Sequence, residues 1–118
     1  MSHRTTERHF AIFKAEVHRL LKLWNIVDWD VRIRHEKTDG LATCEPRAIS
    51  RICVIRLATD WGPNDTPTDD LVRSSARHEV AHLVTGELIM MARSRCVTDD
   101  ELTAAIETTA RRLERMLP

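Results

Sequence analysis

Residues 6–25 repeat their apolar side chains with the period of an α-helix. These side chains follow an i, i+3, i+4, i+7 spacing and form one stripe: Phe10, Phe13, Val17, Leu20, Leu21 and Trp24. A stripe of this kind is the buried face of an amphipathic helix, so we expect a helix here. His9 and His18 fall outside the stripe and should be exposed.

Strand patterns follow the first helix. Residues 28–36 alternate between apolar and polar side chains, which predicts a half-buried strand. A turn at residues 37–40 leads to a short second strand at residues 41–45. Pro46 cannot donate a ladder hydrogen bond, so we expect a break at residues 46–48.

Residues 49–58 form the strongest predicted strand, because they are rich in isoleucine and valine. The segment is apolar on nearly both sides, which favours burial between two layers. A loop follows. Thr66 is then a suitable N-cap, and Pro67 suits the first position of a helix that should run to about Met91.

The last helix is predicted by a capping box formed by Thr98 and Glu101. Its expected buried stripe consists of Leu102, Ala105, Ile106, Thr109, Leu113, Met116 and Leu117. The order helix, two or three strands, helix, helix predicts an α+β fold with an antiparallel or mixed sheet. The length of 118 residues fits a single domain spanning residues 1–118.

Composition narrows the class of protein. The formal net charge is zero, which gives no overall attraction to nucleic acid or acidic membranes. No apolar run has membrane-spanning length, and the N-terminus does not read as a signal peptide. Cys44, Cys53 and Cys96 contain no CxxC pair, which excludes a cysteine zinc ribbon. We therefore expect a cytoplasmic protein whose cysteines act as buried small hydrophobes.

The sequence HEVAH carries the candidate chemistry. His78 and His82 are four residues apart, about one helical turn, so both imidazoles leave the same helix face and can bind one Zn²⁺ ion. Glu79 is rotated by about 100° from His78, which suits a general base acting on a metal-bound water. The alternative is a chance match, but apolar residues flank the motif in a well-capped helix, which favours zinc.

A catalytic zinc needs a third protein ligand. Position 88 is leucine, so the longer pattern with a third histidine six residues after His82 is absent. Glu107 lies in the middle of the last predicted helix, beside its apolar stripe and among small neighbours. We expect Glu107 to be the ligand in preference to the other carboxylates, although an exposed pair with Arg111 is the alternative.

From about Trp29 onward the chain resembles the small phage and bacterial gluzincins related to SprT-like and ImmA/IrrE-like proteins. The segments that carry this resemblance are WDVRIRHE, ISRICVIRLA, RHEVAHLV and ELTAAIETTARRLERML. It implies a zincin-like fold with an N-terminal helix, a sheet of about three strands, an HExxH helix and a C-terminal helix that carries a glutamate. It also implies His78, His82 and Glu107 as zinc ligands and Glu79 as the base.

The chain differs from this family in two respects. It has no cysteine ribbon of the SprT-like kind and no tyrosine, so a histidine, an arginine or a backbone N–H would have to stabilise an oxyanion. The sequence thus predicts a zinc-dependent peptidase that acts on a peptide or protein substrate in a bacterial or phage-infected cell. Strand 49–58 could offer the sheet edge to which that substrate adds. The alternative is that its apolar character makes it a central strand, in which case another strand would take this role.

Two alternatives stay open at this stage. One is a zinc-stabilised module of phage or mobile-element origin that binds a protein partner and has no hydrolytic activity. The other is a nucleic-acid-binding protein, because five arginines could share the outer sheet face: Arg32, Arg34, Arg47, Arg51 and Arg56. A solvated polar face explains these arginines more simply, so a nucleic-acid partner is the less favoured expectation.

Overall fold

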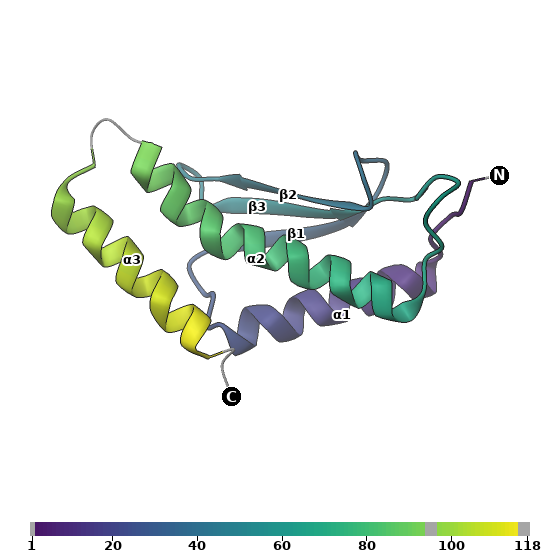
Figure 1. Cartoon of the computed structure of the whole chain (residues 1–118), viewed down its shortest axis with the longest axis horizontal. Coiled ribbons are helices and arrows are strands. Elements are labelled where there is room, and N and C mark those ends of the chain that lie inside the picture. The colour runs from purple at the N-terminus through teal and green to yellow at the C-terminus, as the bar shows by residue number, and fades with distance from the viewer. Residues whose placement is uncertain (1, 94–96, 116–118) are drawn as a thin grey trace.

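The computed structural model describes residues 2–93 and 97–115, except for the side chain of Glu87. Cys96 and the predicted stripe residues Met116 and Leu117 lie outside the described part. The elements are α1 (Glu7–Leu23), β1 (Asp30–His35), β2 (Ala42–Arg47), β3 (Ile52–Leu57), α2 (Asp69–Arg93) and α3 (Asp99–Glu114). They form a small α+β domain in which α1 and α2 run side by side along the sheet (Figure 1).

The sheet is mixed, which is one of the two alternatives that the sequence leaves open. Its strand order is β1-β3-β2, with β3 parallel to β1 and antiparallel to β2. The prediction that β3 lies between two layers is wrong. Charged side chains such as Arg56 and Glu45 occupy the outer face, and β3 is buried because it has a strand on each side. In the strand order β1-β3-β2, strand β2 lies at one edge of the sheet.

Pro46 does not break the second strand, contrary to the prediction, because its nitrogen faces the free edge. The N–H of Ala58 donates to the carbonyl of Leu41 at 2.9 Å, which makes these two residues a hydrogen-bonded pair beside the first pair of the β2–β3 ladder. Bonded and non-bonded pairs alternate in antiparallel ladders. Ala42, Cys44 and Pro46 therefore direct their backbone polar groups away from β3, where a missing donor costs no ladder bond.

Both ends of α1 are capped. Thr6 accepts a hydrogen bond from the N–H of His9, whose side chain accepts one from the N–H of Thr6 in return. At the other end Asn25 has a left-handed φ of 53°, and the N–H groups of Asn25 and Ile26 donate to the carbonyls of Lys22 and Leu21. This is a Schellman motif, and it turns the chain toward β1.

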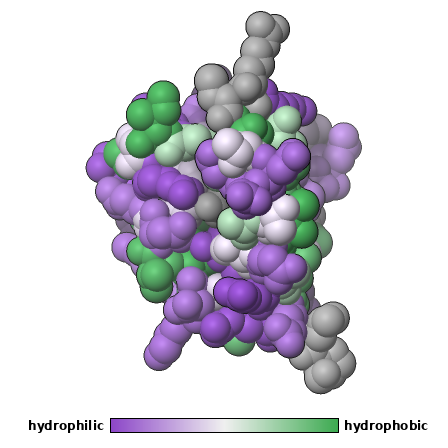
Figure 2. All heavy atoms as spheres, turned by 90° about the vertical axis from the view of Figure 1, so that its left-hand side faces the viewer, coloured by the Kyte–Doolittle hydropathy of each residue, from purple (hydrophilic) through white to green (hydrophobic). Residues whose placement is uncertain are grey.

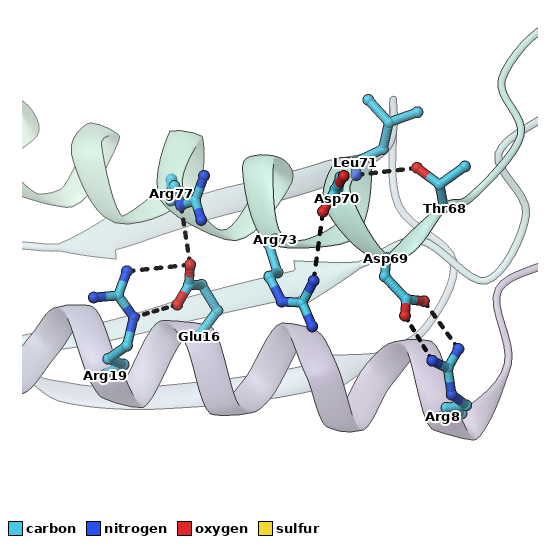
Figure 3. A network of polar contacts seen from close by, with 9 residues as sticks. All are labelled: Arg8, Glu16, Arg19, Thr68, Asp69, Asp70, Leu71, Arg73 and Arg77. Atoms are coloured by element: carbon cyan, nitrogen blue, oxygen red, sulfur yellow. Dashed lines mark hydrogen bonds and ion pairs between the residues drawn. The ribbon is translucent and has the colours of Figure 1, made fainter.

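α2 begins two residues later than the sequence predicts. The Thr68 hydroxyl, not that of Thr66, accepts the N–H of Leu71 at 3.2 Å and is positioned as the N-cap. Polar contacts then fix α2 against α1, as Figure 3 shows. Arg8 makes two hydrogen bonds to Asp69, and the buried Glu16 accepts from Arg19 and from Arg77 of α2.

The core lies between the inner face of the sheet and the helix pair α1–α2. Its fully buried side chains come from α1, β3 and α2: Phe13, Val17, Leu20, Cys53, Ile55, Leu57, Val72, Ala76, Val80, Leu83 and Val84. This packing fixes the rotation of α2 about its own axis. The helix face opposite the core is therefore at the protein surface.

α3 packs less apolar surface than its sequence pattern predicts. Ile106 and Leu113, both assigned to the buried stripe, are 48% and 45% exposed. Thr109 and Arg112 are the buried positions, and Arg112 donates to Asp28 at 2.9 Å, which ties α3 to the segment between α1 and β1. The end of the molecule that carries α3 accordingly shows separate hydrophobic patches on a largely hydrophilic surface (Figure 2). Across the described ranges, no helix combines the length and apolar character needed to cross a membrane.

Candidate metal centre

The middle of α2 brings three potential metal ligands together. His78, Glu79 and His82 each offer a ligand atom, and these atoms lie within 4.8 Å of one another. Both histidines are exposed, whereas Glu79 is 5% exposed. The helical spacing explains this difference, because a residue one position after His78 is rotated toward the sheet.

The two imidazoles converge as metal ligands do. Their Nε2 atoms lie 3.0 Å apart, and their rings meet edge to face with centroids 4.6 Å apart. Two nitrogens bound to one tetrahedral zinc at about 2.0–2.1 Å would lie about 3.3 Å from each other. A small ring rotation converts the observed separation into that value, so this nitrogen pair fits a zinc ion.

Glu79 lies on the core side of the two histidines. Burial raises the pKa of its carboxyl group above the ordinary value, while the neighbouring imidazoles of His78 and His82 act in the opposite direction. A carboxylate with a raised pKa holds a proton more strongly, which is the property needed in a general base.

The three residues lie in a groove of about 710 Å³ between α2 and the edge strand β2. Its sheet side consists of Leu41, Ala42, Thr43, Cys44 and Pro46. Its helix side consists of Leu71, Ser74, Ser75, His78, Glu79, His82 and Gly86. The candidate ligands therefore open onto a space that is bounded by the free edge of a strand.

Two thiols lie near Glu79. The Sγ atoms of Cys44 and Cys53 are 3.4 Å apart, and both residues are free cysteines. The hydrogen bond between the thiols, together with burial, raises the pKa of Cys44, which favours its neutral form. Cys53 is buried, as the sequence predicts, whereas Cys44 is only partly buried and lines the groove. Their contact depends on the β2–β3 register and could not be inferred from their spacing.

The structure does not bring Glu107 to this cluster. Glu107 is exposed on α3, as are Asp99, Asp100 and Glu101 near the start of that helix. The N–H of Glu101 donates to Thr98, as expected for a cap. The assignment of Glu107 as the third ligand stays a prediction.

Carboxylates accompany the arginines of the outer sheet face. Arg32 pairs with Asp30 at 3.2 Å, and Arg56 pairs with Glu36 at 2.7 Å. Arg47 and Arg51 lie 3.5 Å from Glu45 and 3.9 Å from Asp28, respectively. The arginine-rich outer face is therefore of mixed charge.

Comparisons with protein-family models, with curated proteins and with solved structures find no match to this chain.

Proposed function

We propose that this protein is a zinc-dependent peptidase with a zincin-like fold. The observation that carries the proposal is a pair of exposed, converging imidazoles with a buried carboxylate behind them, in a groove beside a free strand edge. His78 and His82 would hold the ion through Nε2. Glu107 is proposed as the third ligand, because a catalytic zinc needs three.

Glu79 is the proposed general base of the reaction. A zinc ion held by the histidines would polarise the scissile carbonyl and lower the pKa of a water molecule. With zinc bound, Glu79 would act as the general base that takes the proton of this water and would return it to the leaving amine. Burial supports this role because it raises the pKa of Glu79 toward neutrality.

The free edge of β2 supports a peptide as the substrate. Ala42 and Cys44, which line the groove, each present a backbone N–H and a carbonyl to the free edge of the sheet, while Pro46 presents a carbonyl alone. An extended peptide can pair with these groups as an added strand. The sequence favoured β3 as the strand that pairs with the substrate. Because β3 is central in the sheet, we assign this pairing to the edge strand β2.

A second candidate is a zinc-stabilised module that binds a protein partner and does not hydrolyse it. The exposed position of Glu107 outside the cluster favours this candidate, because two histidines alone hold a catalytic zinc weakly. The mixed charge of the outer sheet face argues against nucleic acid as the partner.

One experiment separates the two candidates. Casein and a mixed peptide library are incubated with zinc-loaded wild-type protein and with Glu79→Gln, which retains both histidines. The peptidase proposal expects hydrolysis by the wild-type protein and a loss of at least about 100-fold in Glu79→Gln at unchanged zinc content. Zinc binding with equal, negligible hydrolysis by both proteins would contradict the peptidase proposal and support the binding module.

A further inference from the structure

One end of the groove, its closed end, is narrowed by the approach of its two walls. An ideal Cβ atom placed on Gly86 would lie 3.7 Å from the Cγ atom of Pro46, an ordinary van der Waals distance. Helix α2 and strand β2 therefore leave room for about one methyl group between Gly86 and Pro46. Gly86 is one helical turn after His82, so the groove closes about 6 Å beyond the candidate metal ligands.

The opposite, open end of the groove is lined by two apolar side chains. Leu71 lines it from α2 and is 44% exposed, and Leu41 lines it from the segment before β2 and is half-buried. Leu71 lies two turns before His78, which corresponds to about 10 Å or three residues of an extended peptide.

Glu79 is the one carboxylate that lines the groove, and no lysine, arginine or aspartate lines it within the described part of the chain. The charged residues of β2, Glu45 and Arg47, belong to the outer face of the sheet, where they pair with each other. Away from Glu79 and the two histidines, a charged side chain that entered the groove would lose water without gaining a partner of opposite charge, which costs free energy.

The direction of a bound peptide follows from the strand beside it. β2 runs from the Leu41 end of the groove to the Pro46 end. Antiparallel pairing is slightly more stable per residue than parallel pairing. A peptide added to β2 would therefore run from the closed end at Gly86 toward the open end at Leu71.

From these observations we infer the substrate class of the groove, an inference that rests on the proposed function. The occupant is an extended peptide with a small, uncharged side chain N-terminal to the scissile bond. An apolar side chain follows about three residues to the C-terminal side and contacts Leu71. Gly86 is the specificity-determining residue of the closed end, and Leu71 is that of the open end.

The test measures peptide binding by fluorescence anisotropy, using zinc-loaded Glu79→Gln protein, and cleavage by the wild-type protein. The probes are matched ten-residue peptides with glycine, alanine, lysine or glutamate before the scissile bond and leucine or lysine in the third position after it. We expect each charged substitution to weaken binding and cleavage by at least about tenfold.

Two variants alter the groove without removing a candidate ligand. Leu71 is at an exposed position in the first turn of α2. Leu71→Asp should improve binding of the peptide with lysine in the third position after the scissile bond by about fivefold, because an exposed ion pair can then form. Leu71→Asn is the uncharged control and should give no such gain. Gly86→Ala should change the peptide residue preferred directly before the scissile bond from alanine to glycine.

Equal binding of charged and uncharged peptides, or a preference with the two positions in reversed order, would overturn the inference. So would the absence of any binding. Selective binding without cleavage by the wild-type protein would support the groove assignment and contradict the peptidase proposal alone. Cleavage without selectivity would support the peptidase proposal and overturn the specificity inference.

Discussion

The ion pair between Glu16 and Arg77 offers a quantitative test of how α2 is positioned. Glu16 lies on α1 with its side chain 7% exposed, and its Oε2 accepts from Nε of Arg77 at 2.9 Å and from Nη2 of Arg19 at 3.2 Å (Figure 3). Arg77 directly precedes His78 in α2. Replacing Glu16 by glutamine removes the charge, keeps the size of the side chain and leaves both arginines without their carboxylate.

The exposure of the three side chains determines how much Glu16→Gln lowers the free energy of unfolding. Removing one partner of a fully buried ion pair costs about 3–5 kcal/mol, whereas an exposed pair contributes at most about 1 kcal/mol. Glu16 is buried, but the side chains of Arg19 and Arg77 are each 55% exposed and can regain water. We therefore expect Glu16→Gln to lower the free energy of unfolding by about 2 kcal/mol.

The assay is urea unfolding followed by circular dichroism at pH 7 and pH 3.5. The hydrogen bond from Arg19 is the largest cause that lowers the pKa of Glu16 in the folded state, so this stabilisation is present above the unfolded-state pKa and is lost as the pH falls through the folded-state pKa. The wild-type advantage over Glu16→Gln should therefore shrink at pH 3.5. Asp70→Asn is the control, because Asp70 is 99% exposed and pairs with Arg73 at 3.5 Å. Equal effects of Glu16→Gln and Asp70→Asn would refute the reasoning.

Three further predictions concern single residues. Gly86→Ala should raise the free energy of unfolding by about 0.5–1 kcal/mol in urea titrations, because alanine favours the helix and its Cβ meets Pro46 at an ordinary distance; a lower stability would contradict this. Burial lowers the pKa of His35, so the unfolded chain binds more protons and stability should fall as the pH drops through about 6.5; a His35→Gln variant with the same pH slope as the wild type would refute this. Glu107→Ala should weaken zinc binding in competition titrations with a chelator, whereas Glu101→Ala should leave it unchanged; equal zinc affinities would exclude Glu107 as a ligand.

Local patterns predicted the elements that depend on local physics. The apolar stripe from Phe10 to Trp24 is sufficient to define α1, which begins and ends within two residues of the predicted bounds. The spacing of His78 and His82 is likewise local, so their convergence followed from helix geometry alone. A mixed sheet was also among the expected alternatives.

Features that depend on neighbouring segments were not predictable. Pro46 continues β2 because that strand is at the edge of the sheet and its nitrogen faces outward, and strand order is a property of the whole fold. The predicted stripe of α3 is correct at Thr109 but wrong at Ile106 and Leu113, because Arg112, which lies outside the stripe, is the other buried residue of that helix.

The groove is the part of the candidate site that the sequence did not reveal. It forms because β2 and α2 lie side by side, which brings Pro46 next to Gly86 across a long stretch of chain. The lone glycine within the helical pattern, Gly86, was the available signal, because a glycine inside a helix can mark a packing or functional position.

Zinc content tests the central claim most directly. Wild-type protein, Glu79→Gln, His78→Ala and His82→Ala are purified in parallel, equilibrated with zinc, freed of loosely bound metal and analysed by inductively coupled plasma mass spectrometry. The account predicts about one zinc per chain in the wild type and in Glu79→Gln, and a loss of zinc in both histidine variants. A wild-type protein that retains no zinc, or histidine variants that retain it fully, would contradict a metal centre at His78 and His82.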